Sequence, residues 1–283
     1  MADELPAYVL VGGSGGIGSA TAHQLAAKGA RLLLAGRDAA KLDALVAKLQ
    51  EVNPGDYRTA TLDATKSAEV DALFATALEA FGKLSGAACL VGSILIKPAH
   101  LTTDEEFEET MNLNVRTAFY TLRAAVKSMM TGGGSIVLAS TVAAQIGLAN
   151  HEAISTAKGA INGLVKSAAA SYAGRGIRVN GVAPGLVNTP LAKKITSSEM
   201  TLKVSTAMHP LGRIGEPEDI ATPITWLLDP KTSWVTGQMI SVDGGMSVVR
   251  GKYRSRRAAG ISPLFLPDVG ATESPKRSKL LAG

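Results

Sequence analysis

The chain has 283 residues, of which 46% are hydrophobic, 19% are charged and only 4% are aromatic, and its net charge is +5. This length allows one large α/β domain or two small ones. The single cysteine, Cys89, excludes an internal disulfide framework and a thiolate metal site, and it is typical of a reducing compartment. We therefore expect a cytoplasmic protein.

The positive charge is concentrated near the C-terminus. From Arg250 onward the chain has eight basic and two acidic residues, whereas the preceding part has 21 basic and 22 acidic ones. The main part therefore gives no indication of a nucleic-acid surface. The first residues have no signal-peptide pattern, and the apolar runs are too short to span a membrane, so we expect no membrane partner.

Short apolar stretches alternate with amphipathic stretches of helical periodicity as far as about residue 246. The expected strands are residues 7–12, 31–36, 57–63, 86–92, 134–140 and 177–185. The expected helices are residues 19–30, 38–50, 67–82, 104–130 and 152–173. Unbroken apolar strands between helices are typical of a parallel sheet covered on both faces. We predict a Rossmann-type doubly wound α/β domain over 1–246, without repeats, and a basic extension over 247–283.

A glycine-rich segment, VGGSGGIGSA (11–20), joins the first strand to the first helix. Glycines allow a tight turn and bring a pyrophosphate close to the helix N-terminus, where free N–H groups favour an anion. No Gly-Lys-Ser/Thr follows, so a P-loop is excluded. The segment predicts a dinucleotide site that uses Gly12, Ser14, Gly16, Ile17 and Gly18.

The end of the second strand indicates which dinucleotide binds. An acid directly after this strand accepts a hydrogen bond from the adenosine ribose of NAD, whereas an arginine suits the 2′-phosphate of NADP. Here Gly36 and Arg37 take this place and Asp38 follows one position later. NADP is therefore preferred and NAD is less favoured, although Arg37 could also be an ordinary solvated residue at a helix start.

Further motifs occur in a fixed order, and together they resemble the short-chain dehydrogenase/reductase family over residues 6–246. They are GGSGGIG (12–18), TLDAT with Asp63, Gly92, MNLNV with Asn114, ASTVA (139–143), RVNGVAPGLVNTP (178–190), PLGRIGEPEDIA (210–221) and VTGQMISVDGG (235–245). The resemblance implies cofactor contacts from Asp63, Gly92, Lys158, Pro184, Gly185, Val187 and Thr189. It also implies a homotetramer or dimer acting on a small molecule.

The same resemblance exposes a departure in HEAISTAKGA (151–160). In the family a tyrosine exchanges the proton at the substrate oxygen, a lysine four residues later lowers its pKa, a serine polarises the carbonyl and an asparagine supports a relay water. The lysine falls on Lys158 and the asparagine on Asn114, and a threonine, Thr141, takes the serine place. The tyrosine position holds Ile154, which cannot transfer a proton.

A replacement acid could come from His151, seven residues before Lys158 on the expected helical face. Enoyl reductases of the same superfamily carry their tyrosine at this offset. Its imidazole has an ordinary pKa of about 6.5, but a histidine at a helix start is often only a cap. His209 and His100 lie in segments that flank the cleft in relatives, and Tyr120 and Tyr172 lie on helices expected to pack against other subunits.

A second departure is CLVG (89–92), where the family usually has Asn-Asn-Ala-Gly. Gly92 is retained, whereas Cys89 is more readily interpreted as a small buried apolar residue than as a nucleophile.

The extension over 247–283 fits a solvated tail or one packed on another subunit, and a docking segment for a protein partner is the alternative.

These patterns predict an NADP(H)-dependent oxidoreductase with a catalytic set of Asn114, Thr141, Lys158 and His151 and without a metal. Its reaction would be hydride transfer at a carbonyl or alcohol, or at an activated C=C bond that needs less help from a proton donor. The alternative is a catalytically silent NAD(P)-binding protein that acts as a structural subunit or a sensor.

Overall fold

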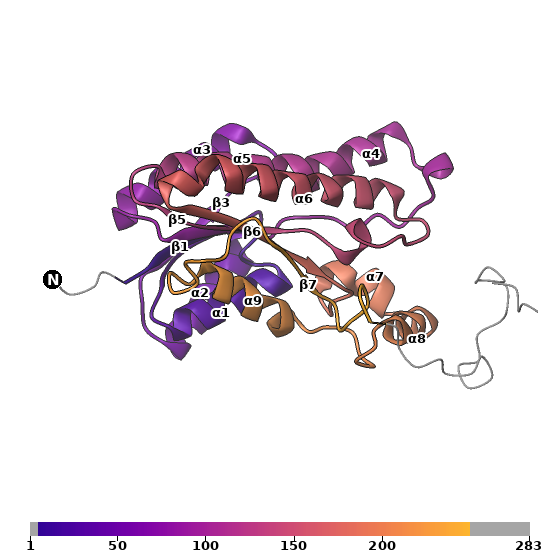
Figure 1. Ribbon diagram of the computed structural model, residues 1–283. Coiled ribbons are helices and arrows are strands. Elements are labelled where there is room, and N and C mark those ends of the chain that lie inside the picture. Colours follow the sequence, from indigo (N-terminus) through magenta and orange to yellow (C-terminus); the bar gives the residue numbers. More distant parts are fainter. Residues whose placement is uncertain (1–4, 250–283) are drawn as a thin grey trace, which may run out of the picture. The chain divides into compact units, whose positions relative to one another are not determined.

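A computed structural model describes residues 5–249 of the chain. Seven parallel strands form one sheet in the order β3-β2-β1-β4-β5-β6-β7 (Figure 1). The strands are β1 (Ala7–Val11), β2 (Arg31–Gly36), β3 (Tyr57–Thr61), β4 (Gly86–Cys89), β5 (Gly134–Ala139), β6 (Ile177–Pro184) and β7 (Met239–Val242). The predicted Rossmann-type doubly wound fold is confirmed.

Helices cover both faces of the sheet, as the two layers in Figure 1 show. One layer contains α1 (Gly16–Ala27), α2 (Ala39–Val52) and α9 (Pro217–Leu228). The other contains α3 (Ser67–Phe81), α4 (Asp104–Met111), α5 (Thr117–Met129) and α6 (Glu152–Tyr172). Two short helices, α7 (Lys193–Thr196) and α8 (Glu199–Met208), follow the end of β6.

Each layer encloses its own apolar core. All five residues of β1 are buried, with Val9 facing the α3, α5 and α6 side and Leu10 facing the α1, α2 and α9 side. This two-sided burial explains why the strands are continuous apolar runs rather than alternating ones. The rigid double core holds the carboxyl ends of the strands in place, which is where such sheets bind ligands.

The strand order reverses between β1 and β4, which lie side by side although β2 and β3 separate them in sequence. A crevice for ligands opens at this switch point beyond the carboxyl ends of both strands. The glycine-rich segment follows β1, and Gly92 lies shortly after β4. Both segments therefore meet at the crevice.

The long helix expected over 104–130 is interrupted. A capping box between Thr103 and Glu106 starts α4, and a π-helical turn, Asn112–Arg116, separates α4 from α5. Single π turns inside helices are frequent at functional sites. Sequence periodicity did not assign this turn, nor β7, α7, α8 and α9.

Within residues 5–249, no helix is both long and apolar enough to cross a membrane. The same part of the chain contains no cluster of three or more histidine, cysteine, aspartate or glutamate side chains that could hold a metal. The interpretations of the basic extension fall mostly on residues outside those described.

Candidate active site

The glycine-rich loop is held by close backbone approach. Gly12 has a φ of +88°, which favours glycine, and its N–H donates to Ala35 O of β2 at 2.8 Å. A Cβ on Gly18 would overlap the carbonyl oxygen of Gly12, and a Cβ on Gly16 would lie 2.9 Å from Thr189 Cγ2. The loop and the segment after β6 therefore pack against each other without room for side chains.

The N-terminus of α1 presents free backbone donors. Its cap residue, Gly15, has no side-chain cap, and the first turn carries no acid. The first helical hydrogen bond runs from Ser19 N–H to Gly15 O, so the three preceding N–H groups, on Gly16, Ile17 and Gly18, have no helical acceptor. These N–H groups and the helix dipole make an anion site.

The end of β2 separates the basic residue from the acid. Asp38 is the N-cap of α2 and accepts a hydrogen bond from Lys41 N–H at 3.1 Å. Arg37 is exposed and forms no ion pair or hydrogen bond within residues 5–249. Ser14 Oγ lies 2.9 Å from the place where a Cβ on Gly36 would be, so the loop closes over this strand end. Asp38 is committed to the helix, and Arg37 is available.

Asp63 lies beyond the end of β3 and is fixed by its neighbours. One carboxylate oxygen accepts from Thr65 N–H at 3.0 Å and from the Thr65 hydroxyl at 2.7 Å. These bonds, with the Thr65 hydroxyl first, lower the pKa of Asp63. The carboxylate is therefore ionised at neutral pH and keeps its second oxygen available as an acceptor.

The buried side chains of Lys158 and Asn114 both lie close to Gly92. A Cβ on Gly92 would lie 2.9 Å from Asn114 Oδ1 and 3.2 Å from Lys158 Nζ. Asn114 is fully buried in the π-helical turn, where its amide donates to Thr110 O at 2.8 Å and to Ser93 Oγ at 2.9 Å, and its Oδ1 accepts from Ser93 N–H. The turn thus aims the asparagine at the lysine across a glycine.

The ammonium of Lys158 is buried, and no carboxylate among the described residues pairs with it. Its Nζ donates to Ala139 O, at the end of β5, at 2.9 Å. Burial lowers the pKa of Lys158 from 10.5 to about 8. The lysine therefore releases a proton far more readily than a surface lysine does.

Two adjacent hydroxyls at the end of β5 point in different directions, as the alternation along a strand predicts. Ser140 Oγ is buried and lies 2.8 Å from Asn162 Oδ1 and 3.0 Å from Lys158 O, so it braces α6. Thr141 Oγ1 makes two long bonds, donating to Pro184 O at 3.4 Å and accepting from Ala143 N–H at 3.3 Å, and Thr141 lines the pocket described next. Thr141, rather than Ser140, holds the more available hydroxyl.

A pocket of about 370 Å³ opens above this group. Its lining includes Ile17, Gly92, Thr141 and Lys158, together with Ile154, which is 5% exposed. Within residues 5–249, no aspartate or glutamate lines it. The side chain at the tyrosine position therefore faces the pocket and supplies only an apolar surface.

The segment after β6 closes the other side of the pocket. Pro184, Gly185, Val187 and Thr189 all line it. Thr189 caps the short 3₁₀ turn Pro190–Ala192 by accepting from Ala192 N–H at 3.3 Å, and its methyl group lies against the glycine loop. The predicted cofactor residues of this segment thus border the same space as Lys158.

Of the histidines, His151 and His209 line the pocket and His100 does not. His151 is the N-cap of α6 rather than a residue within it, and its Nδ1 faces Ala149 O at 2.7 Å. Nδ1 therefore carries the proton in the neutral ring, and Nε2 has no hydrogen-bond partner in the described part of the chain. Neither Tyr120 nor Tyr172 lines the pocket.

The role of His209 could not be read from the sequence. Its Nδ1 faces Ser205 O at 2.7 Å, and its Nε2 accepts from Leu186 N–H at 3.2 Å. Both ring nitrogens are occupied, so the buried ring ties α8 to the segment after β6. Leu186 and His209 are 23 residues apart, and no local pattern links them.

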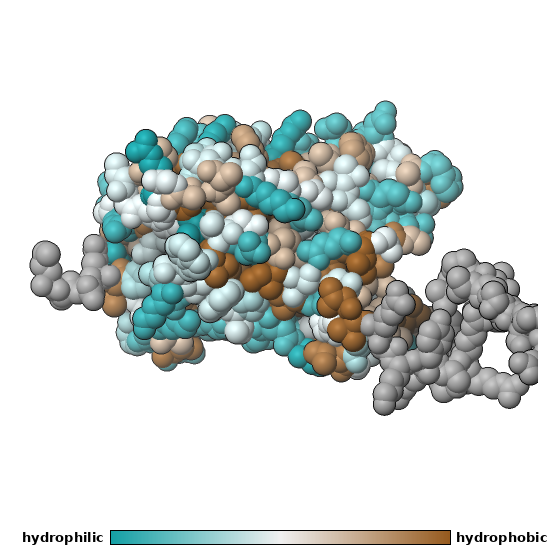
Figure 2. Space-filling model, viewed as in Figure 1, coloured by the Kyte–Doolittle hydropathy of each residue, from teal (hydrophilic) through white to brown (hydrophobic). Residues whose placement is uncertain are grey.

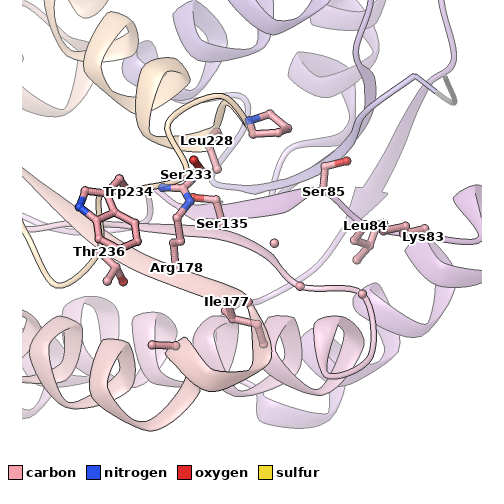
Figure 3. A pocket seen from close by; sticks show the side chains of 16 residues that line it. Lys83, Leu84, Ser85, Ser135, Ile177, Arg178, Leu228, Ser233, Trp234 and Thr236 are labelled. Atoms are coloured by element: carbon pink, nitrogen blue, oxygen red, sulfur yellow. The ribbon is translucent and has the colours of Figure 1, made fainter.

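A second cavity, of about 600 Å³, lies at the opposite edge of the sheet, at the amino ends of β5 and β6. Figure 3 shows Arg178 and Trp234 on one side of it and Lys83 on the other. Arg178 is braced there by the carbonyl oxygens of Val235, Leu227 and Asp229. None of the predicted site residues lines this cavity.

Cys89 lies in the core, buried as expected.

Known proteins resemble the chain over almost the whole described range. A family model described as Enoyl-(Acyl carrier protein) reductase matches residues 12–247. Glucose 1-dehydrogenase of Gluconobacter oxydans (strain 621H) is 35% identical over 85% of this chain and 91% of that protein. Short-chain dehydrogenase/reductase aba4 of Botryotinia fuckeliana (strain B05.10) is 37% identical over 83% of this chain and 94% of that protein.

A solved structure resembles the chain as well. A short-chain type dehydrogenase/reductase from Mycobacterium ulcerans superposes with a TM-score of 0.83 at 34% identity, covering 87% of this chain and 91% of that one. The chain belongs to the short-chain dehydrogenase/reductase family, an oxidoreductase family that uses a nicotinamide dinucleotide. The glycine cradle and the free N–H groups of α1 fit the pyrophosphate of such a cofactor.

Proposed function

We propose that the protein is an NADP(H)-dependent oxidoreductase that transfers hydride at a carbonyl or alcohol, or at an activated C=C bond, in a site without the usual tyrosine. One observation carries the proposal: Lys158, Thr141 and Gly92 border one pocket together with Ile17 of the glycine loop and Thr189. Four of these groups serve the cofactor, and Thr141 adds a hydroxyl for the substrate, which a chain kept only for its surface would not need.

The choice of NADP rests on the end of β2. The available guanidinium of Arg37 suits a phosphate dianion, whereas Asp38, the acid that follows it in sequence, is engaged as the cap of α2. Arg37 and Ser14 would hold the 2′-phosphate, and Asp63 would accept from the adenine amine. An NAD ribose would find Asp38 already bonded to the start of α2.

When bound, the nicotinamide would supply or accept the hydride. The protein would supply the remaining functions: Thr141 Oγ1 would donate a hydrogen bond to the substrate oxygen, and Lys158, held by Ala139 O, would supply a cation beside it. In reduction, one proton must reach the product for each hydride. The two donors at the pocket are His151, through Nε2 when the ring is protonated, and the Lys158 ammonium, which would reach the substrate through water.

The apolar Ile154 favours one rival function. A positioned general acid contributes about 10²–10⁴-fold in rate, and Ile154 removes the family's acid. A silent NAD(P)-binding protein, acting as a subunit or sensor, would keep the nucleotide site and could lose the acid. A homotetramer or dimer and a cytoplasmic location stay predictions from the family and the composition.

The test pairs binding with turnover. NADPH and NADH are titrated into the wild-type protein by calorimetry, and carbonyls and enones are then screened for cofactor oxidation. Ile154→Tyr restores the phenol, and Ile154→Phe is its matched control because it adds the ring without the hydroxyl. We expect tighter binding of NADPH, measurable wild-type turnover and a further gain in Ile154→Tyr only.

Turnover in Ile154→Tyr with none in the wild type would support the silent nucleotide-binding protein instead. If neither dinucleotide binds, the cofactor assignment and the oxidoreductase function are both wrong. If the wild type turns over, His151→Ala then compares the two proton donors, because loss of activity in this variant assigns the proton to His151 and retention assigns it to Lys158.

A further inference from the structure

The pocket above Lys158 has an apolar floor. Val142, Ile154 and Val187 line it and are buried, at 2%, 5% and 6% exposure. In the family a phenol hydroxyl would occupy part of this floor, so Ile154 makes it less polar still. A polar substrate group placed here would lose its water without gaining a hydrogen bond, which is costly.

The mouth of the pocket is apolar as well. Four of its lining residues are also large hydrophobic side chains exposed by 40–56%: Ile94, Ile96, Leu191 and Met208. We call these four residues the rim. Ile94 and Ile96 come from the segment after β4, whereas Leu191 and Met208 come from the 3₁₀ turn after β6 and the end of α8. The rim therefore has apolar residues on both walls.

The surface around the rim also exposes apolar side chains. In Figure 2, brown side chains gather beside the region where α7 and α8 lie in Figure 1. Met200 on α8 and Leu211 just after it are 72% and 74% exposed. Exposed apolar groups that gather at the mouth of a pocket mark a surface that a ligand or partner covers.

The pocket has few charged groups with which to recognise a ligand. Within residues 5–249 no carboxylate lines it, and His209 uses both ring nitrogens within the protein. Lys158 is buried and bonded to Ala139 O at the floor, away from the rim. A sugar would need several donors and acceptors along the walls, and an organic anion would need a cation near the mouth. Among the described residues the lining carries the hydroxyls of Ser93, Thr201 and Ser205 and the His151 ring, but apolar side chains form most of it.

We propose that the pocket takes a neutral, lipophilic ketone or enone, with its oxygen at Thr141 and its apolar body between the two walls of the rim. This inference rests on the proposed function, because it names the substrate class of the same site. Met208 adds adaptability to the rim, since a flexible thioether side chain packs against different apolar shapes.

The test measures binding separately from turnover. Straight-chain 2-ketones from 2-butanone to 2-decanone are titrated by displacement of an apolar fluorescent dye from the protein in the presence of NADP⁺. Each methylene transferred from water to an apolar surface contributes about 0.8 kcal/mol, which is about fourfold in affinity. We therefore expect affinity to rise by up to about fourfold per methylene until the chain passes the rim.

Two matched variants show which surface gives rise to the dependence of affinity on chain length. Leu191→Glu places a charge on the rim and should flatten the dependence on chain length, with the affinity for NADPH unchanged. Trp234→Glu makes the same kind of change at a 98% exposed apolar residue beside the other cavity and should leave the dependence intact. Size-exclusion chromatography of Leu191→Glu checks that the rim is not a contact between copies of the chain.

The two proposals fail differently. Ketones that bind with the expected chain-length dependence but are never reduced would overturn the enzymatic function and leave the ligand class standing. NADPH oxidation with sugars or keto acids only would support the enzymatic function and overturn the lipophilic-substrate inference. A flat dependence in the wild type, or a change of oligomeric state in Leu191→Glu, would overturn the lipophilic-substrate inference.

Discussion

Gly92 lies directly against Lys158: a Cβ on this glycine would be 3.2 Å from Lys158 Nζ, and 2.9 Å from Asn114 Oδ1. The glycine is therefore required by the two side chains it faces and not by its backbone conformation, because its φ lies outside the left-handed region. The crowding explains why Gly92 is kept in CLVG although the residues before it depart from the family pattern.

Gly92→Ala should destabilise the protein and weaken nucleotide binding. Both neighbouring side chains are buried and hydrogen-bonded, so neither can retreat freely, and overpacking of this kind costs about 1–3 kcal/mol. Chemical denaturation measures the loss. Gly147→Ala is the control, because a Cβ there meets nothing within 4 Å and surface changes stay within about 0.5 kcal/mol. Equal stability of the two variants would contradict the crowding.

The buried ammonium of Lys158 should make stability rise with pH. Burial lowers its pKa to about 8 in the folded protein, against 10.5 in the unfolded chain. Between these values the unfolded state binds more protons, so the free energy of unfolding increases with pH. The penalty is complete below pH 8, disappears above pH 10.5 and amounts to about 3 kcal/mol.

Lys158→Met isolates this contribution, because it keeps the length of the side chain and removes the charge. The difference in unfolding free energy between the variant and the wild type should favour the variant at pH 7 and shrink toward pH 10.5. Urea unfolding at both pH values measures it. A difference that does not vary with pH would mean that Lys158 titrates normally.

Arg37 should govern the choice between the two dinucleotides. A hydrogen bond to a charged group contributes about 1.5–3 kcal/mol, so Arg37→Ala should weaken NADPH binding by about 10- to 100-fold and leave NADH binding unchanged. Lys48→Ala removes the same charge from an exposed position on α2, and it controls for the effect of the lower net charge on binding of an anionic cofactor. Equal losses for both dinucleotides in Arg37→Ala would assign the residue to a part of the cofactor that both share.

Much of the site was predictable because its motifs are local. The glycine loop, Arg37 and Asp63 each follow a strand end, and chain order alone fixes strand ends in a parallel sheet. Lys158 was predictable because one helical turn separates it from Ile154. The fold followed from the alternation of apolar strands and amphipathic helices, since that alternation decides which faces can be buried.

What the sequence did not predict depends on contacts between distant segments. The π turn of Asn112–Arg116 was read as plain helix because its apolar spacing does not differ from that of a helix. His209 was only a candidate near the cleft, since its bond to Leu186 exists only once α8 has folded back. The apolar rim combines residues about 100 positions apart, so its character emerges only in three dimensions.

His209 should be a stabilising residue and not an acid. Because its Nδ1 faces Ser205 O and its Nε2 accepts from Leu186 N–H, His209→Ala would leave a buried donor unsatisfied as well as a cavity. We expect a loss of about 2–4 kcal/mol and faster hydrogen exchange in α8. His100→Ala removes an exposed histidine and serves as the control. Unchanged exchange in α8 would refute the role assigned to this ring.

Asn114 should control the proton affinity of Lys158, since both side chains lie about 3 Å from the same point over Gly92. Asn114→Asp would put a carboxylate beside the ammonium, and an opposite charge at this range favours the charged form. The pKa of Lys158 should then rise from about 8 toward its ordinary value, which ¹⁵N-detected titration of the Nζ signal would follow. Thr110→Val is the control, because Asn114 accepts no bond from this hydroxyl and the backbone acceptor Thr110 O is retained.

If Lys158 gives up the proton in reduction, the carboxylate variant should also slow turnover at neutral pH, since a lysine with a normal pKa is a weaker acid. A raised pKa with unaltered turnover would leave His151 as the proton donor.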